Sequence, residues 1–351
     1  MRKLSMVAVS GLIASLALTG CGKSSSTTTG GSSDVCTGFS GTGPKVGLAF
    51  DVGGRGDHSF NDSAYAGISK AVSELKASCV SGAATTGESD SARANRLKLM
   101  AQQGATDIIG VGFSYSNAVA TVAPNFPNVH FLVIDGFNPG KGQPANVQYA
   151  SFAAEQSSYL VGVAAALQTK TKQVGFVGGV NIPLINTFQA GYTAGVHSVN
   201  PSIKVNAAYI EQSDLSGFAD PAKGKTVAKG LFDGGADVVY EAAGASGSGV
   251  FDAAVAANAW SIGVDSDSYL AATPTQQKHI LTSALKNVDV AVFDFLQSET
   301  TNSFKAGYST YDLKNDGVGY ATSGGYVDSY KSKIDAAAAA IKSGSVTVPT
   351  K

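Results

Sequence analysis

The stretch that decides the fold is KVGLAFDVGGRGDHSFNDSAYAGISKA, residues Lys45–Ala71. Its apolar run Val46–Phe50 predicts a buried parallel strand that ends at Asp51. A glycine-rich loop follows, and apolar residues then recur at helical spacing from Ala64 to Leu75. A strand, a loop and a helix in this order predict the first unit of an open α/β sheet.

Ligands of open α/β sheets bind beyond the carboxyl ends of the strands. Asp51, Ser59, Phe60 and Asn61 would stand at that position. The alternative is an ordinary loop before a helix, in which Ser59 or Asn61 only caps the helix.

The same rhythm of strands and helices continues along the chain. Further strands of a first domain are predicted at residues 107–112, 129–134 and 148–152. An Ala-rich helix at 155–167 begins a second domain, whose strands are predicted at 173–177, 204–210, 237–240, 260–264 and 280–285. A short strand at 317–321 and a long terminal helix at 326–343 complete the pattern. The sequence therefore predicts an α/β protein with two halves of similar length.

Composition and motifs exclude several classes of function. The chain has 351 residues, 42 of them Gly, and a formal net charge of −1, which gives no electrostatic basis for binding nucleic acid. The four histidines are scattered without metal-ligand spacing, and no phosphate-binding, zinc-protease or serine-hydrolase motif occurs. We therefore expect no catalytic residue, no metal and no cofactor.

The N-terminus indicates the compartment. The basic pair Arg2-Lys3 precedes an apolar run at 4–18 that is too short for a stable transmembrane span. The following Leu18-Thr19-Gly20-Cys21 resembles the lipobox of bacterial lipoproteins, which implies cleavage of a signal peptide at 1–20 and diacylation of Cys21. The alternative is a chance cysteine after a signal peptide. Residues 22–33 are almost all Gly, Ser and Thr, so 21–44 is expected to act as a flexible tether.

Cys36 and Cys79 can form a disulfide outside the cytoplasm. Cys36 precedes the first strand, and Cys79 is expected to end the first helix, which returns antiparallel to that strand. Both should lie at the sheet edge away from the ligand cleft. Two separate thiols remain the alternative.

A series of motifs resembles the basic membrane protein family, lipoprotein receptors of ABC importers of which several bind purine nucleosides. Asp51, two glycines and then Asp57-His-Ser-Phe-Asn61 are similar to the family's opening signature. Further family-like motifs follow in order at 110–113, 177–179, 217–224, 243–249, 262–267 and 282–286. The chain departs from the family pattern at 114–117, where an acidic residue is frequent, at Gly217, where Ser is frequent, and at Ser268, where Gln is frequent.

The resemblance covers Lys45 to the C-terminus and implies the type I periplasmic-binding-protein fold, two Rossmann-like lobes around a ligand cleft. In that fold the chain crosses between lobes three times, here expected near Ala153, Lys286 and Ser323. Lobe 1 would then comprise 45–152 and 287–322, and lobe 2 would comprise 153–286 and 323–351.

The resemblance also implies a site for the base of a nucleoside. In the nucleoside receptors, two Phe rings from different lobes sandwich the base, and Phe60 and Phe218 occupy the matching positions. Stacking tolerates every base, so Asp51, Asn61 and Asp135 are the candidates that would select it. As alternatives, Phe60 could pack on its own helix and Phe218 could be an exposed loop residue.

The second lobe would hold the ribose. Asp265 and Lys286 match the family's ribose-binding residues, and Gly244 belongs to its alanine-glycine loop. A carboxylate that accepts two adjacent hydroxyls beside an ammonium suits a cis-diol. The alternative for Lys286 is a surface charge that ends a strand.

The sequence thus predicts a non-enzymatic, lipid-anchored solute-binding protein outside the cytoplasmic membrane. It would bind a nucleoside, with a purine expected, and deliver it as a monomer to an ABC permease. A receptor for a sugar or another polar solute in the same fold is the second reading. A nucleoside hydrolase that uses Asp51 and Asp265 is the third.

Overall fold

The structure is a computed structural model that describes residues 34–351, of which Val35–Lys351 form one compact unit. The signal peptide, Cys21 and residues 22–33 of the tether lie outside the described residues. No helix within the described part is long and apolar enough to cross a membrane.

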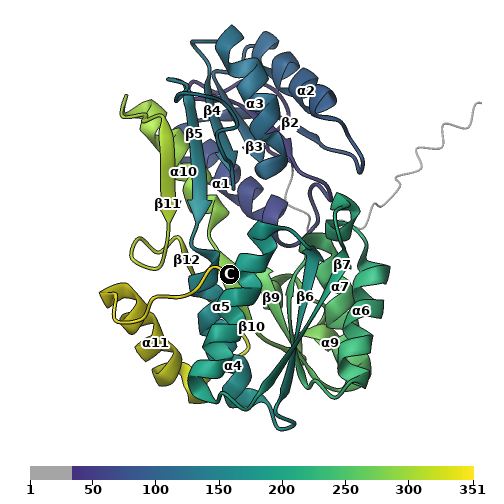
Figure 1. The fold of residues 1–351 in the computed structure, drawn as a ribbon. Helices are drawn as coiled ribbons and strands as arrows, with labels where there is room; N and C mark the ends of the chain where they lie inside the picture. The colour runs from purple at the N-terminus through teal and green to yellow at the C-terminus, as the bar shows by residue number, and fades with distance from the viewer. Residues whose placement is uncertain (1–33) are drawn as a thin grey trace, which may run out of the picture. The chain divides into compact units, whose positions relative to one another are not determined.

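Two six-stranded sheets organise the described residues (Figure 1). The first has the order β11-β5-β4-β3-β1-β2 and is parallel throughout. Its strands are β1 (Lys45–Phe50), β2 (Ser78–Ala83), β3 (Asp107–Val111), β4 (His130–Ile134), β5 (Val147–Phe152) and β11 (Gly307–Tyr311). The second has the order β12-β10-β9-β8-β6-β7, with β12 antiparallel to β10. Its strands are β6 (Gln173–Val180), β7 (Lys204–Glu211), β8 (Val238–Ala242), β9 (Trp260–Asp265), β10 (Ile280–Lys286) and β12 (Val318–Tyr320).

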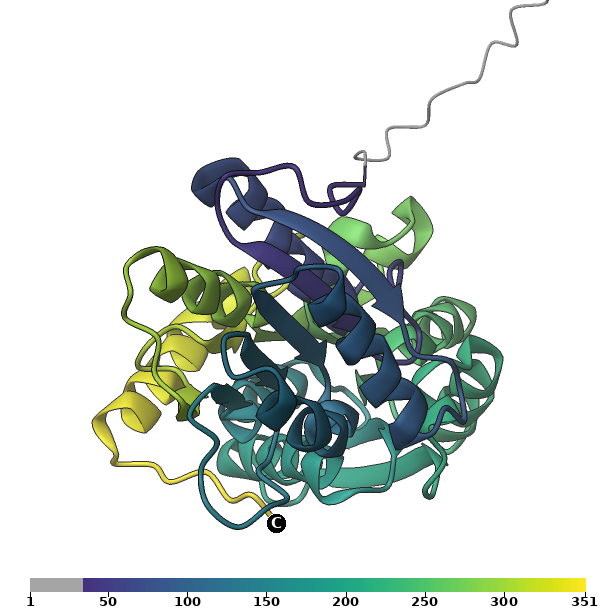
Figure 2. The same cartoon turned by 90° about the horizontal axis from the view of Figure 1, so that it is seen from above.

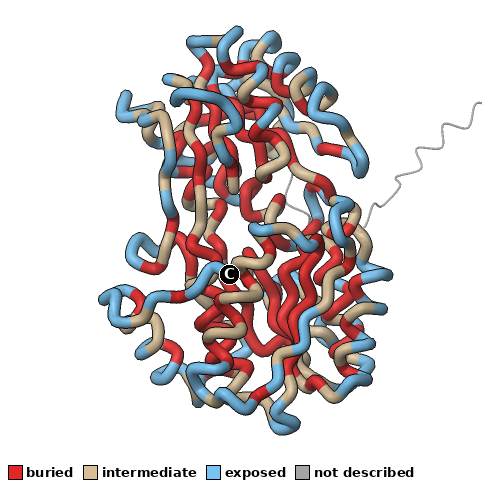
Figure 3. The backbone as a smooth tube through the Cα atoms, in the orientation of Figure 1, coloured by how far each residue is buried: buried red, intermediate tan, exposed pale blue. Residues whose placement is uncertain are grey.

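Helices cover both faces of each sheet, which is why the central strands are continuous apolar runs. Buried apolar side chains from α1 and α10 form the core on one face of the first sheet, and those from α2 and α3 form the core on the other. On the second sheet α4 and α5 lie opposite α6 and α7. Figure 3 shows the central strands of the second sheet as nearly continuous buried segments. The helices are α1 (Phe60–Leu75), α2 (Asp90–Gln102), α3 (Ser116–Val122), α4 (Ala154–Gln168), α5 (Pro183–Val199), α6 (Pro221–Asp233), α7 (Gly247–Ala257), α8 (Ser268–Ala271), α9 (Pro274–Gln277), α10 (Val288–Thr300) and α11 (Lys331–Ser343).

This arrangement confirms the predicted fold class of two parallel-rich α/β lobes. The chain passes from the first sheet to the second after β5, returns after β10, and passes again between β11 and β12. The third passage therefore falls at residues 312–317, before the expected position near Ser323. Residues 287–322 were expected in lobe 1, but β12 pairs with β10 in the second sheet, with Val318 opposite Lys286. The true last strand of the first sheet, β11, was not predicted, because all its residues except Tyr311 are partly or fully exposed and it carries little apolar signal.

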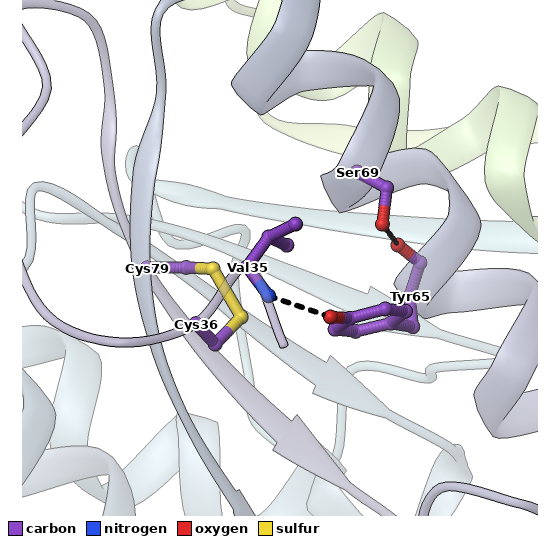
Figure 4. The surroundings of a disulfide bond; sticks show 5 residues. All are labelled: Val35, Cys36, Tyr65, Ser69 and Cys79. Atoms are coloured by element: carbon purple, nitrogen blue, oxygen red, sulfur yellow. Dashed lines mark hydrogen bonds between the residues drawn. A yellow bond between two sulfur atoms is a disulfide. The ribbon is translucent and has the colours of Figure 1, made fainter. Parts of the chain in front are cut away.

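The edge strand β2 was also missed, because its sequence SCVSGA contains few apolar residues. It runs parallel beside β1, as Figure 2 shows. Cys79 therefore lies in a strand and not at the end of α1. A disulfide joins it to Cys36, with a Cα–Cα distance of 4.4 Å (Figure 4). The neighbouring Val35 backbone N–H donates to the Tyr65 hydroxyl at 2.7 Å, which holds this segment on α1.

Candidate functional site

One pocket collects side chains from the carboxyl ends of strands in both sheets. All eight residues proposed from the sequence as ligand contacts line this pocket. They are Asp51, Phe60, Asn61, Asp135, Phe218, Gly244, Asp265 and Lys286. The first and the last of these residues are more than two hundred positions apart in the sequence. They lie close together only because the two lobes meet at this pocket.

Lys286 links the two sheets at the floor of the pocket. It is the last residue of β10 and only 3% exposed, so the alternative of a surface charge is wrong. Its Nζ donates to Oδ2 of Asp135, which follows β4 of the first sheet, and lies 4.0 Å from Oδ1 of Asp265. A buried ammonium is stable only when such carboxylates offset its desolvation.

The two carboxylates beside Lys286 sit on unusual backbone. Asp135 has φ 55° and Asp265 has φ 61°, the left-handed region that non-glycine residues seldom adopt. Each turns the chain sharply at the end of its strand, β4 or β9. Such strain at two facing strand ends is typical of binding and catalytic sites.

The pKa of Asp265 is shifted by its buried surroundings. Burial raises its pKa to about 6, although Lys286 and a hydrogen bond from Ser59 oppose that rise. Ser59 Oγ donates to Asp265 Oδ2 at 2.7 Å, and Ser266 Oγ donates back to the Ser59 carbonyl oxygen at 3.0 Å. These two bonds join the loop before α1 to the end of β9, and so connect the lobes directly.

The loop before α1 is held by Asp57, which the sequence analysis did not select. The Asp57 carboxylate accepts the backbone N–H groups of Ser59, Asn61 and Asp62 at 3.0, 2.8 and 3.0 Å. Ser59 occupies the N-cap position without a side-chain cap bond, so the alternative in which Ser59 or Asn61 caps the helix is wrong. Asp57 therefore caps the helix, and the side chains of Ser59 and Asn61 bond other partners. The Asp-x-Ser spacing at residues 57–59 could have indicated this role, because an Asp side chain commonly accepts the backbone N–H two residues further on.

Asp51 and Asn61 form a fixed polar pair on the first lobe. The Asp51 backbone N–H donates to Asn61 Oδ1 at 2.9 Å, and Asn61 Nδ2 donates to Asp57 at 3.0 Å. The Asp51 carboxylate accepts from Ser114 Oγ at 3.0 Å, and burial raises its pKa. Ser114 lies in the segment that departs from the family pattern, and here it orients this carboxylate. A Cβ on Gly112 would stand 2.2 Å from Asp51 Oδ2, so glycine at this position leaves room for the Asp51 carboxylate.

Two aromatic rings reach the pocket from different lobes. Phe60 is the first residue of α1, and Phe218 ends the short 3-10 helix Leu215–Phe218. Both are half-buried, and Lys286 Nζ lies 4.5 Å from the centroid of the Phe60 ring, within cation–π range. The Phe218 ring packs over Gly179, where an added Cβ would come within 2.5 Å of a ring carbon.

The close packing under Phe218 also explains a departure from the family pattern. A Cβ on Gly217 would approach the carbonyl oxygen of Gly179 to 2.1 Å, so the Ser that is frequent at this position could not fit here without a backbone shift. The wall beside Phe218 is apolar and was not foreseen, because its members are indistinguishable in sequence from core residues. It consists of Leu184, Ile185, Phe188 and Leu215.

A further buried acid lies behind the pocket. Glu241 in β8 is 2% exposed, and its carboxylate accepts the Ala243 backbone N–H at 2.9 Å. Burial raises its pKa to about 8. It lines a smaller adjoining pocket together with Asp57, Ser59 and Gly244. Glu241 could not be selected from the sequence, because one acid in an apolar strand has no distinctive spacing.

Comparison with known proteins assigns the family. Residues 45–351 match the model for the Bmp family, described as ABC transporter substrate-binding protein PnrA-like. The chain belongs to this family. It is 36% identical over 327 residues to the ABC transporter nucleoside-binding protein BmpA of Lactococcus lactis subsp. cremoris, covering 88% of this chain and 89% of that protein. It is 33% identical over 282 residues to basic membrane protein A1 of Borrelia garinii subsp. bavariensis, covering 79% of each chain.

Two solved structures of ABC transporter solute-binding proteins have a similar fold. A solute-binding protein of an ABC transporter system from Aeropyrum pernix K1 superposes with a TM-score of 0.74 at 28% identity, covering 88% of this chain and 94% of that one. A solute-binding protein from Conexibacter woesei shows the same fold, with a TM-score of 0.68 at 24% identity. As a Bmp family member the protein is an extracytoplasmic substrate-binding protein, and its partners are a small-molecule substrate and a transporter permease.

Proposed function

We propose that this Bmp family protein is a lipid-anchored receptor that binds a purine nucleoside between its lobes and presents it to an ABC permease. One observation carries the proposal. Phe60 and Phe218 come from different lobes, yet they line one pocket that also contains the buried Asp265–Lys286 pair. The name of the Lactococcus lactis relative, a nucleoside-binding protein, supports the same ligand class.

The aromatic rings suit the base. Stacking on an aromatic side chain is worth roughly 1–3 kcal/mol per base and depends little on which base is present. Selection therefore falls to the polar groups of the first lobe. Asp51 and Asp135 offer acceptor oxygens, and Asn61 offers the second N–H of its Nδ2, because its Oδ1 and one N–H already bond Asp51 and Asp57.

The ribose suits the charged end of the pocket. An ionised Asp265 can accept hydrogen bonds from both the 2′- and 3′-hydroxyls, and Lys286 can donate to either oxygen. Lys286 also keeps the buried carboxylate ionised near neutral pH, since its positive charge lowers the pKa of Asp265 against the effect of burial. Ser59 already donates to Asp265, so its hydroxyl lies beside the carboxylate that would hold the sugar.

Attachment to the membrane through Cys21 belongs to this proposal, and its support is the lipobox-like Leu18-Thr19-Gly20-Cys21. Two acyl chains give stable anchoring where one would be marginal. The Gly-, Ser- and Thr-rich tether would let a monomeric receptor reach its permease.

The ligand itself provides the test. Mass spectrometry of small molecules released from the denatured purified protein should find a purine nucleoside. Calorimetry with adenosine, guanosine, inosine, cytidine, free bases and ribose should show that purine nucleosides bind most tightly. Tight binding of ribose or another sugar without any nucleoside would replace the proposal with a sugar receptor. Free base that accumulates during incubation with a nucleoside would instead show a hydrolase.

A further inference from the structure

Three potential metal ligands meet at the edge of the first sheet opposite the cleft. Asp107 is the first residue of β3, and His130 is the first residue of β4. The two residues are direct partners in the parallel register, so their side chains leave the sheet side by side. Glu299 joins them from the last turn of α10.

The three side chains are close enough to share one ion. One ligand atom from each of them lies within 4.8 Å of the other two, and His130 Nδ1 is 2.8 Å from Glu299 Oε2. The His130 ring stacks on Phe304, with centroids 4.0 Å apart and planes 9° from parallel. The stacking fixes the plane of the imidazole, and the contact with Glu299 places Nδ1 on the side of the carboxylates. All three line a pocket together with residues 42–44, and this pocket leaves room for water.

Both carboxylates have coordination capacity that the described residues do not use. Asp107 is 2% exposed, and the only side-chain hydrogen bond it accepts within the described chain comes from Thr106 Oγ1 at 2.6 Å. Glu299 Oε1 is buried and has no hydrogen-bond partner in residues 34–351. Buried oxygens of this kind are rare in proteins unless a water or an ion satisfies them.

The local charge also favours a cation. Among the described residues, no Lys or Arg forms an ion pair with Asp107 or Glu299, and His130 is the one basic partner. Glu299 stands at the C-terminal end of α10, where the helix dipole adds further negative potential. Two carboxylates and a helix terminus therefore face a single imidazole.

We propose that Asp107, His130 and Glu299 bind a divalent transition-metal cation, with Zn²⁺ the best match. Two carboxylate oxygens and one imidazole nitrogen, completed by water, form a ligand set that Zn²⁺ accepts, whereas Mg²⁺ and Ca²⁺ prefer oxygen ligands alone. On binding, Nδ1 directs its lone pair to the metal and any proton on that nitrogen is released. The ion would link the end of α10 to the starts of β3 and β4, away from the nucleoside cleft.

The test uses untagged, chelator-treated protein, titrated with ZnCl₂ in a calorimeter and followed by thermal unfolding. Wild type should bind one equivalent of Zn²⁺ and show a saturable rise in Tm. His130→Gln and Glu299→Gln should lose both effects. His279→Gln is the matched control, because His279 is another half-buried imidazole whose Nδ1 lies 2.8 Å from an oxygen, the Ala259 carbonyl. It should bind Zn²⁺ as wild type does.

A measurement on wild type alone covers the case in which a variant fails to fold. Crystals grown with Zn²⁺ should give an anomalous difference peak at the zinc edge between the three side chains. Absence of saturable Zn²⁺ binding, retention of it in His130→Gln, or a zinc peak elsewhere with none at this cluster would each overturn the proposal. Nucleoside affinity should be the same with and without chelator, which separates this inference from the proposed function.

Discussion

Lys286 Nζ donates a hydrogen bond to Asp135 Oδ2, although Lys286 ends β10 of the second sheet and Asp135 directly follows β4 of the first. The bond places a buried cation where the two lobes meet, beside Asp265 and beneath Phe60. A ligand in this pocket would therefore contact groups that already join the lobes. Binding and closure of the lobes are expected to be coupled through them.

Truncation of either aromatic ring should weaken nucleoside binding. Phe60→Ala and Phe218→Ala should each cost roughly 1–3 kcal/mol, about a tenfold to hundredfold loss of affinity, because one face of the base loses its stacking partner. Calorimetry with the tightest-binding purine nucleoside measures this. Phe137→Ala is the control, since Phe137 is an exposed ring outside the pocket lining. Equal affinities in all four proteins would disprove the clamp.

Removal of the Asp265 charge should act on the sugar. Asp265→Asn is expected to weaken ribonucleosides more than 2′-deoxynucleosides, because the deoxy ligand has already lost one hydroxyl that the carboxylate would accept. Lys286→Met should weaken both classes, since it leaves buried carboxylates without their cation. Competition binding with paired ribo- and deoxynucleosides decides the point. An equal loss for both classes in Asp265→Asn would remove the ribose role.

Ligand affinity should also fall in mild acid. With a pKa of about 6, Asp265 takes up a proton as the pH drops through that value and then no longer pairs with Lys286 as an anion. Ribonucleoside affinity should decline from pH 7 to pH 5, and the decline should be much smaller in Asp265→Asn. A flat wild-type profile over this range would count against a carboxylate contact to the ribose.

Glu241 should make the folded state less stable as the pH rises. Burial raises its pKa from 4.5 to about 8, so between these values the folded protein holds a proton that the unfolded chain releases. The free energy of unfolding should therefore decrease with pH across this window, by up to about 1.4 kcal/mol per pH unit from this residue. Glu241→Gln stays neutral and should flatten the profile in urea titrations. Glu211→Gln, at a partly exposed site paired with Lys223, should leave the profile unchanged.

The Cys36–Cys79 disulfide should be present in the exported protein. Thiol titration of denatured, non-reduced protein carrying Cys21→Ser should find no free thiol. The bridge spans 43 residues, which corresponds to about 4 kcal/mol of stabilisation by the chain-entropy estimate. Cys79→Ser should accordingly lower the denaturation midpoint. Two reactive thiols in the parent protein would refute the bridge.

Cys21→Ala should release the protein from membranes of its host, because both acyl chains are lost together. Fractionation of cells into membrane and soluble material, followed by immunoblotting, measures this. Cys36→Ala is a useful comparison, since it removes a cysteine that cannot be acylated at the cleavage site. Membrane retention of Cys21→Ala equal to wild type would exclude lipidation at this residue.

The sequence by itself determined the α/β class, the two lobes and eight of the residues that line the pocket. Val46–Phe50 and the other central strands are buried on both faces, so they appear as apolar runs that need no tertiary information. The family motifs then marked the strand ends. The two edge strands of the first sheet escaped the same reasoning: β2 and β11 carry few buried apolar residues, so no period or run distinguishes them from loops.

The tertiary structure alone decided the contacts between distant residues. Sequence spacing cannot show that Ser59 bonds Asp265, or that Asp57 rather than Ser59 caps α1. Nor can it show that Asp107, His130 and Glu299 converge, because strand register and the docking of α10 bring together positions far apart in the chain. Local patterns encode which element forms, whereas burial, ion pairing and raised pKa values arise only when packed elements exclude water around a few polar groups.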